Sequence, residues 1–243
     1  TLGSADPRVA MDLNGRIIVV WSRKSSDASA PGNTLWSQRY SNGNWLTVAQ
    51  RISNLPTRDN SGYALSPALA MGINGTAMAV WTDNGQTSNA ARSIWAATFN
   101  GSNWSAPLPV SDGTRTAYDA RVATDAAGSF IVVWTQDTNI QGAAQPAALP
   151  IPNVWARHYN AGAWGTAQPI GFAGLVAGEG VISPHLGMNA GGDAMVVWVQ
   201  THAGQVSIAG NGYRAGTALW RTPAYIDNLP TQASSPAVSL DNA

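Results

Sequence analysis

Three tryptophans open extended runs at matching positions of the chain, and polar side chains accompany two of them. In Trp155-Ala-Arg157-His-Tyr159, the alternation of an extended strand places Arg157 and Tyr159 on the same face as Trp155. A planar guanidinium beside two aromatic rings can hydrogen-bond to the hydroxyl groups of a sugar. The same guanidinium could instead cap exposed backbone carbonyls at a sheet edge. The candidate ligand-binding residues are Trp36, Gln38, Trp95, Trp155, Arg157 and Tyr159.

A second candidate set carries positive charge. Arg8, Arg121 and His185 each stand second in an extended run that begins a repeated unit of the chain. If these first runs surround a central axis, the three side chains line the mouth of a channel, where they would meet a polar or anionic ligand. The alternative is a solvated channel wall with no ligand.

The residues needed for catalysis do not form a recognisable set. The three histidines occupy different positions in different units, and no Gly-x-Ser-x-Gly elbow accompanies them. Asp12 and Asp125 align with each other in one turn, and Asp112 and Asp227 align in another, which is typical of side chains that hydrogen-bond to turn backbone. We therefore predict that the protein is not an enzyme.

A metal site has one weak candidate. Asp12-Leu-Asn14-Gly15 offers oxygen ligands in a tight turn, as a Ca²⁺ loop does. However, Gly72 and Asn189 stand at the Asp12 position in two other units. The sequence thus favours a plain hairpin turn, and we predict no metal and no cofactor.

The composition excludes several classes of partner. The 243 residues include 13 basic and 13 acidic side chains, so a zero net charge gives no indication of nucleic-acid binding. There are no cysteines, and no apolar run approaches the ~20 residues of a membrane-spanning helix. The chain begins with Thr1, which is expected of a processed or excised segment. We predict a secreted or bacterial cell-surface protein without membrane insertion.

A repeated frame must position all of these residues. A Gly follows the first position of the frame by eight residues, and a Trp follows that Gly by six. Each frame gives an alternating strand, a turn and an apolar strand, and two further extended runs follow it. The four copies are Pro7–Gly15–Trp21, Pro67–Gly75–Trp81, Ala120–Gly128–Trp134 and Pro184–Gly192–Trp198.

Four short antiparallel strands in each unit of about 50 residues are typical of propeller blades. We predict a single all-β domain over residues 1–243, a β-propeller of four-stranded antiparallel blades, with a β-sandwich or a solenoid of hairpins as the alternatives. We expect either that the chain continues beyond Ala243 or that the open blade edge associates with another copy. The predicted blades are 7–52, 67–110, 120–170 and 184–226, with the first strand of a fifth at 236–243.

The frame, with Val-Ala-Met-Asp before its Gly and Val-Val-Trp after it, resembles a repeat of bacterial secreted and surface proteins that are propeller-like. A narrower stretch, Trp95-Ala-Ala-Thr-Phe-Asn-Gly-Ser-Asn-Trp104, is similar to the blades of propeller lectins. The second resemblance implies that sugars bind between adjacent blades, against aromatic faces.

Two functions follow from these patterns. The first is a non-catalytic extracellular propeller that binds carbohydrate or mediates adhesion, with glycans or cell-surface polymers as partners. The second is a purely structural surface or filament protein in which the Trp and Gly repeats only pack.

Overall fold

The computed structural model describes residues 3–24, 32–54, 64–83, 91–138, 151–227 and 232–242. Every regular element in these ranges is a β-strand. A search of the same residues for a helix long and apolar enough to cross a membrane found none.

The strands form four sheets, and each sheet is an antiparallel meander in chain order. The first blade contains β1 (Ser4–Met11), β2 (Ile17–Lys24), β3 (Asn33–Ser41) and β4 (Asn44–Arg51), and the second contains β5 (Ala64–Met71), β6 (Ala77–Asp83), β7 (Ser93–Phe99) and β8 (Leu108–Pro109). The third contains β9 (Ala117–Thr124), β10 (Phe130–Thr138), β11 (Ile151–Asn160), β12 (Ala163–Trp164) and β13 (Gln168–Pro169). The fourth contains β14 (Gly180–Met188), β15 (Ala194–His202), β16 (Gln205–Arg214), β17 (Leu219–Trp220) and β18 (Ala224–Tyr225).

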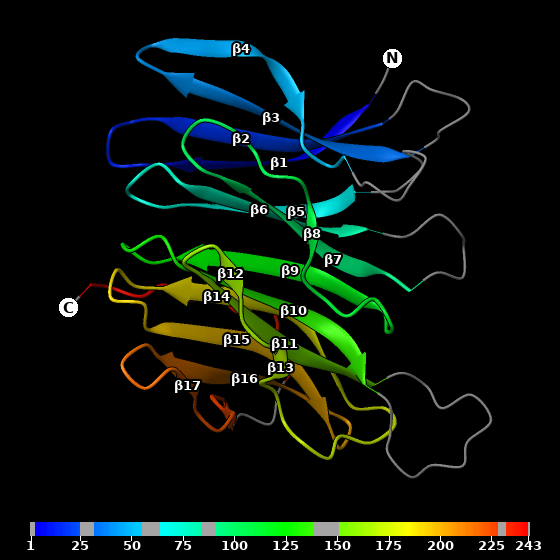
Figure 1. Ribbon diagram of the computed structural model, residues 1–243. Coiled ribbons are helices and arrows are strands. Elements are labelled where there is room, and N and C mark those ends of the chain that lie inside the picture. The colour runs from blue at the N-terminus through cyan, green and yellow to red at the C-terminus, as the bar shows by residue number, and fades with distance from the viewer. Residues whose placement is uncertain are drawn as a thin grey trace.

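The sheets stack face to face in the order of the chain, as propeller blades do (Figure 1). The first strands of successive blades pack beside one another, β1 against β5, β5 against β9 and β9 against β14. The predicted all-β propeller fold is therefore confirmed, and the first strands are the inner ones.

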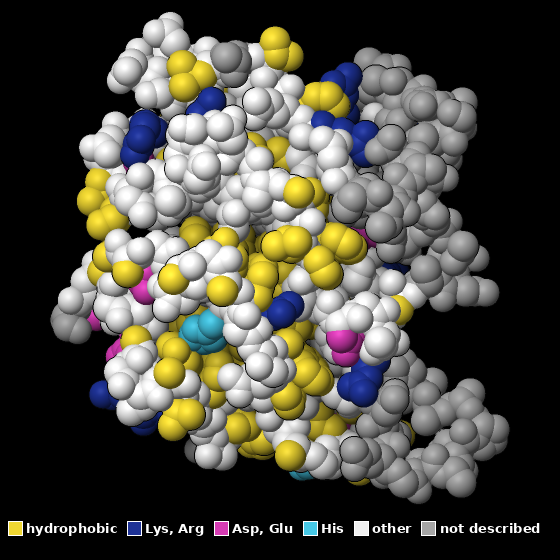
Figure 2. Space-filling view, viewed as in Figure 1, with side chains coloured by type: hydrophobic (Ala, Val, Ile, Leu, Met, Phe, Trp, Pro, Cys, Tyr) yellow, Lys and Arg dark blue, Asp and Glu magenta, His cyan; other side chains and the backbone are white. Residues whose placement is uncertain are grey.

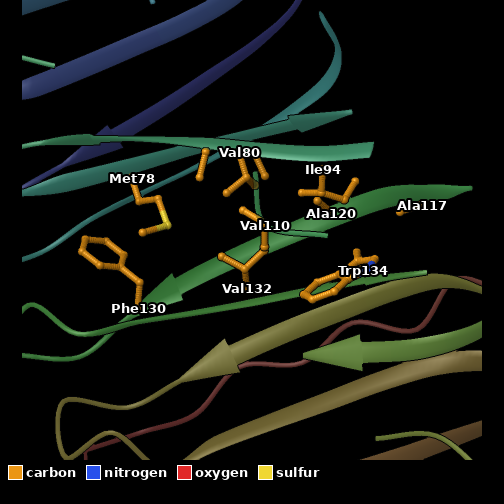
Figure 3. Close-up of a cluster of buried hydrophobic side chains, with 11 residues drawn as sticks. Met78, Val80, Ile94, Val110, Ala117, Ala120, Phe130, Val132 and Trp134 are labelled. Carbon is orange, nitrogen blue, oxygen red and sulfur yellow. The ribbon is translucent and has the colours of Figure 1, made fainter. Parts of the chain in front are cut away.

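A buried apolar cluster fills each of the three contacts between consecutive blades, which we call seams. Trp81, Trp134 and Trp198 each belong to one of these clusters and are fully buried. In the second seam, Met78, Val80 and Ile94 of the second blade face Phe130, Val132 and Trp134 of the third (Figure 3). Figure 2 shows hydrophobic side chains along the seams on one side of the molecule. The matching tryptophans thus mainly hold blade to blade.

The first blade has one face that no other sheet covers among the described ranges, and we call it the open face. Cross-strand pairing places Met11, Ile17, Tyr40 and Trp45 on this face, together with Val9, Val19, Trp21, Trp36 and Gln38. Trp21 is only half-buried, whereas its counterparts in the other blades are fully buried. The equivalent face of the second blade forms the first seam with Ile18, Val20 and Leu35.

A β-bulge interrupts every inner strand at one position, which the sequence had not revealed. Asp6, Ser66, Asp119 and Ser183 adopt positive φ angles of 52°, 48°, 55° and 54° immediately before the first residue of each frame. Two residues of the inner strand there oppose one residue of the second strand. That single residue is the frame tryptophan, so the bulge and the tryptophan occur together in every blade.

The fourth strands and the last blade differ in detail from the prediction. The expected fourth runs at 104–110 and 164–170 are interrupted, and only short pieces pair with the third strand. In the fourth blade, residues 211–213 are part of the continuous strand β16. Asn211 is buried there and donates a hydrogen bond to the carbonyl oxygen of Ile170 at 2.8 Å, which fixes the strand against the preceding blade.

Residues 232–242 lie along β14 without ladder pairing in the part of the chain that is described. Ser235 has a φ of 57°, the bulge conformation of the four inner strands. Leu240 packs so closely on Gly187 that a Cβ there would approach its Cδ1 to 2.8 Å, and the Ala190 amide donates to Asn242 Oδ1 at 2.8 Å. The segment expected to begin a fifth blade therefore has the positive φ angle of the inner-strand bulges, and it packs against the inner strand β14.

Candidate functional site

The predicted aromatic residues lie at three separate places. Trp36 is on the open face, where its Nε1 donates to Thr34 Oγ1 at 2.8 Å. Trp95 packs against the first seam cluster and donates to Ser93 Oγ at 3.0 Å, and Trp155 packs against the second seam cluster. Since each indole belongs to a different blade surface, the three do not form one site.

The sequence left two roles open for Arg157, sugar binding and the capping of backbone carbonyls. In the structure its guanidinium caps backbone carbonyls. Its Nε donates to the Gly165 carbonyl at 2.8 Å, and its Nη1 donates to Val110 at 3.0 Å and to Pro109 at 3.3 Å. The guanidinium carbon lies 5.3 Å from the centre of the Trp164 ring. Arg157 thus ties the third blade to the end of the second, as Asn211 ties the fourth to the third.

The predicted channel residues come from inner strands that lie side by side, and their charges act on one another. Burial lowers the pKa of Arg121, and the charge of Arg8 acts in the same direction, while Asp119 opposes both. Burial lowers the pKa of His185 as well, with a further contribution from Arg121. The second blade has Ala68 at this position. The structure therefore gathers three basic side chains near the inner strands, and their role in ligand binding stays a prediction.

One position on the third strand decides how well each seam is filled near the turns. Arg39 of the first blade lies over the Phe99 ring of the second, with its guanidinium carbon 5.0 Å from the ring centre. His158 of the third blade lies 4.3 Å from the Tyr213 ring of the fourth. The equivalent residue of the second blade is Thr98, whose short side chain leaves open the space beside Tyr159. We call this space the seam cleft.

The seam cleft has a volume of about 360 Å³, against about 140 Å³ for the cavity that Arg39 lines in the first seam. Among the described residues its polar side chains are all uncharged, and aromatic rings and alanines supply the apolar part of its wall. Its side-chain lining includes Asn74, Thr76, Thr98, Asn100, Asn160, Phe99, Phe130 and Tyr159. Tyr159 is the single residue of the predicted ligand set that lines it.

The turns that carry the three asparagines also orient their amides. Asn74 Oδ1 accepts from the Thr76 amide and hydroxyl, at 3.0 and 2.7 Å. Asn100 Oδ1 accepts two backbone amides, and Asn160 Oδ1 accepts the Ser129 hydroxyl at 3.2 Å. Among the described residues the three Nδ2 groups donate to no partner, so they remain as donors for a ligand. The sequence gave no signal that these three asparagines line one space.

Three of the four aligned aspartates accept amides of their own turns, as predicted. Asp12 Oδ1 accepts from the amides of Asn14 and Arg16 at 2.9 Å each, Asp125 Oδ1 accepts from Ser129 at 2.8 Å, and Asp112 Oδ1 accepts from Thr114 at 2.9 Å. Asp227 instead accepts the amide of Ile208 on β16 at 2.9 Å. Within the described ranges no three His, Cys, Asp or Glu side chains lie close enough to share a metal ion.

Comparison with known proteins gives structural similarity alone. No protein-family model matches the chain, and a search of curated proteins found no match. A protein of unknown function from Dyadobacter fermentans matches with a TM-score of 0.62 and 13% identity, over 97% of this chain and 71% of that one. An ulvan lyase of polysaccharide lyase family PL25 matches with a TM-score of 0.59 and 10% identity, over 90% of this chain and 55% of the lyase. The α-L-arabinanase of Penicillium chrysogenum complexed with arabinobiose matches with a TM-score of 0.58 and 13% identity, over 97% of this chain and 70% of the arabinanase.

These similarities support the propeller fold and overturn one prediction. The chain spans 71%, 55% and 70% of the lengths of these three structures. The prediction that the protein is not an enzyme is contradicted, because structures with this fold include a polysaccharide lyase and an arabinanase. The prediction relied on the lack of a familiar motif, but a catalytic set is recognised by geometry and not by sequence position, so a missing motif does not exclude one. The resemblance to bacterial surface repeats stays a prediction.

Proposed function

We propose that the chain binds a neutral stretch of a polysaccharide in the seam cleft between the second and third blades. The observation that carries the proposal is the lining of the cleft, where three amide donors and two threonines surround a space bounded by the Tyr159 ring. Sugar hydroxyls pair with amides and hydroxyls, and the apolar face of a sugar ring packs on an aromatic ring. Polar groups without charge discriminate sugars by hydrogen-bond geometry rather than by charge.

The fold is consistent with this proposal. Two structural neighbours, a polysaccharide lyase and an arabinanase, are named for carbohydrate substrates. The proposal extends that chemical class to this chain and places the protein outside the cell or on its surface, where polysaccharides occur.

The test is a glycan array followed by titration calorimetry on the hits, with variants of Thr98. Thr98→Arg reproduces the side chain that the first blade has at this position and fills the cleft, so we expect a loss of affinity of at least about tenfold, or about 1.4 kcal/mol. Thr98→Ser keeps the cleft open and should bind as the unchanged chain does. Equal binding by Thr98→Arg would place the sugar elsewhere.

The same oligosaccharide hits also answer the catalytic question. Incubation with the protein, followed by separation of the products, measures cleavage directly. A cleaved hit that Thr98→Arg no longer cleaves would assign the reaction to this seam.

The second candidate function, a repeat protein that assembles through its blades, has its own support. On the open face Val9, Met11 and Trp45 are 67%, 63% and 57% exposed, although the corresponding faces of the other blades form seams. We propose a second copy of the chain as the partner of this face. Sedimentation velocity across a concentration range should show association that Met11→Arg removes; a monomer at all concentrations contradicts assembly.

A further inference from the structure

The first seam contains a cavity at the position that the seam cleft occupies in the second seam. It has a volume of about 140 Å³ and lies between the β1–β2 turn and the β5–β6 turn, which stand at the same end of the two blades (Figure 1). Strand pairing shows the equivalence, because Arg39 pairs with Ile18 on β2 as Thr98 pairs with Met78 on β6. We call this space the arginine cavity, because Arg16 and Arg39 both line it.

Two residue differences distinguish the arginine cavity from the seam cleft. Arg16 follows the turn glycine of the first frame, and Thr76 follows the turn glycine of the second. Arg39 and Thr98 share a register position on the third strand of their blades. Thr76 and Thr98 both line the seam cleft, so an arginine stands in the first seam for each threonine of the second. Equivalent spaces of the fold therefore differ in charge.

Asp12 and the second blade hold Arg16 in position. Arg16 Nε donates to Asp12 Oδ2 at 2.6 Å, and its Nη2 donates to the Asn74 carbonyl at 3.3 Å, which leaves Nη1 without a partner among the described residues. The guanidinium lies so close to Gly75 that a Cβ there would approach Arg16 Cζ to 2.7 Å. The Asp12 side chain is fully buried and that of Arg16 is 39% exposed, so one side of the guanidinium is fixed and the other reaches solvent.

Arg39 supplies a charge that no acidic side chain of the lining balances. Its guanidinium carbon lies 5.0 Å from the centre of the Phe99 ring, and the guanidinium makes no hydrogen bond or ion pair with a described residue. The side chain is half-buried, so its donors are positioned by the seam and remain accessible to a ligand. No Asp or Glu is among the described residues that line the cavity, and Asp12 beside it is engaged by Arg16. Two guanidinium groups against one carboxylate leave an excess of positive charge.

The contact between blades does not require these two arginines, because the second seam forms with a threonine at each position. An arginine presents a planar fork of N–H donors that matches the oxygens of a carboxylate or sulfate group. The cavity exceeds the roughly 30 Å³ that a water molecule occupies in the liquid, so it has room for such a group. The position of the arginines thus suits recognition of an oxyanion.

We propose that the arginine cavity binds a carboxylate or sulfate group, with Arg39 as the charged partner and Arg16 Nη1 as a second donor. A free anion and an acidic sugar both carry such a group, and the experiment distinguishes these two sources. The proposal is independent of sugar binding in the seam cleft, since neither arginine lines that cleft.

The test is an NMR titration that follows the Nε–Hε resonance of Arg39 at constant ionic strength. The anionic probes are inorganic sulfate, glucuronic acid and glucose 6-sulfate, and glucose is the neutral probe. We expect a saturable shift with the anionic probes and none with glucose. Tighter binding of the acidic sugars than of sulfate supports the site and identifies an acidic sugar as its ligand, whereas equal or weaker binding supports it as a small-anion site. No saturable shift with any anionic probe, or the same shift with glucose, would overturn the proposal.

Matched variants separate this site from general charge effects, and the backbone amides of Gly75 and Gly101, which also line the cavity, report on binding in all of them. Arg39→Thr introduces the residue of the second blade and should lower the affinity for the tightest anionic probe by at least about tenfold, which corresponds to about 1.4 kcal/mol. Arg39→Lys keeps the charge but not the planar fork, so its affinity should lie between those of Arg39→Thr and the unchanged chain.

Arg214→Thr is the control for net charge, because it removes the same charge from an exposed position outside the cavity and should bind as the unchanged chain does. Circular dichroism shows whether each variant is folded, and a folded Arg39→Lys tests the site even where Arg39→Thr does not fold. Unchanged affinity in folded Arg39→Thr or Arg39→Lys, or an equal loss in Arg214→Thr, would contradict an oxyanion site at Arg39.

Discussion

The packing of the seams predicts that the same Val→Ala substitution lowers the free energy of unfolding by different amounts in different blades. Val19, Val132 and Val196 occupy the same register position on the second strand of the first, third and fourth blades. Val132 and Val196 are fully buried in seam clusters, whereas Val19 lies half-buried on the open face. Substitution by alanine tests whether the seams contribute the stability that their packing implies.

The magnitude follows from the atoms removed. Val→Ala deletes two methyl groups, which at about 0.8 kcal/mol for each buried carbon gives about 1.6 kcal/mol. The space left behind adds roughly 1 kcal/mol where neighbours cannot close it, so Val132→Ala and Val196→Ala should each cost about 2–3 kcal/mol. Val19→Ala should lower the free energy of unfolding by less than about 1 kcal/mol, mainly because alanine has a lower strand preference than valine.

The measurement is urea unfolding of the three variants and the unchanged chain, followed by tryptophan fluorescence and by circular dichroism. The loss of strand preference is common to all three, so the difference between Val132→Ala and Val19→Ala isolates burial in the seam. The unfolding is measured at a concentration at which the chain is monomeric. Equal losses at the two sites would then refute the reasoning, since burial in the seam would add nothing to the loss of stability.

Three further predictions concern single side chains. Arg157→Ala should lower the free energy of unfolding by about 2 kcal/mol, as charged hydrogen bonds to the backbone of the preceding blade are lost, and Arg157→Lys should not restore it in a urea melt. Burial lowers the pKa of His158 below the usual histidine value of 6.5, so the unfolded chain binds the proton first and stability should fall as pH decreases below 6.5. His158→Phe should flatten this part of the pH profile of thermal unfolding. Ser183→Val should cost about 1–2 kcal/mol, because a β-branched residue resists the positive φ of the bulge, whereas Ser183→Gly should be neutral or stabilising by calorimetry.

The blade architecture could be predicted from the sequence because its signals are local and repeated. A turn glycine and a terminal tryptophan at constant spacing give the strand order, and the apolar runs, such as Ala77–Trp81, are buried on both faces as their composition indicates. The bulge before each frame was not predicted, because Asp6 or Ser66 before a proline does not reveal a positive φ. The kink becomes apparent only when the two strands are paired.

The seam cleft could not be predicted because it depends on residues in different blades. Thr98 leaves space only in relation to Tyr159, some sixty residues away, and nothing near Thr98 in the sequence marks it. The role of Arg157 was left open for the same reason, since its acceptors at Val110 and Gly165 lie in different segments. The lack of local motifs does not decide whether the chain is catalytic, because catalytic residues can come from segments far apart in the sequence.

The contrast among Arg39, Thr98 and His158 has a consequence for how such a protein can diversify. Each of these residues belongs to one blade and faces a ring of the next, outside the apolar clusters that hold the blades together. Duplication of a blade would copy the packing surfaces unchanged, and the residue at the position of Arg39, Thr98 and His158 could then vary. Selection could then open or close recognition sites one seam at a time while the apolar clusters continue to hold the blades together.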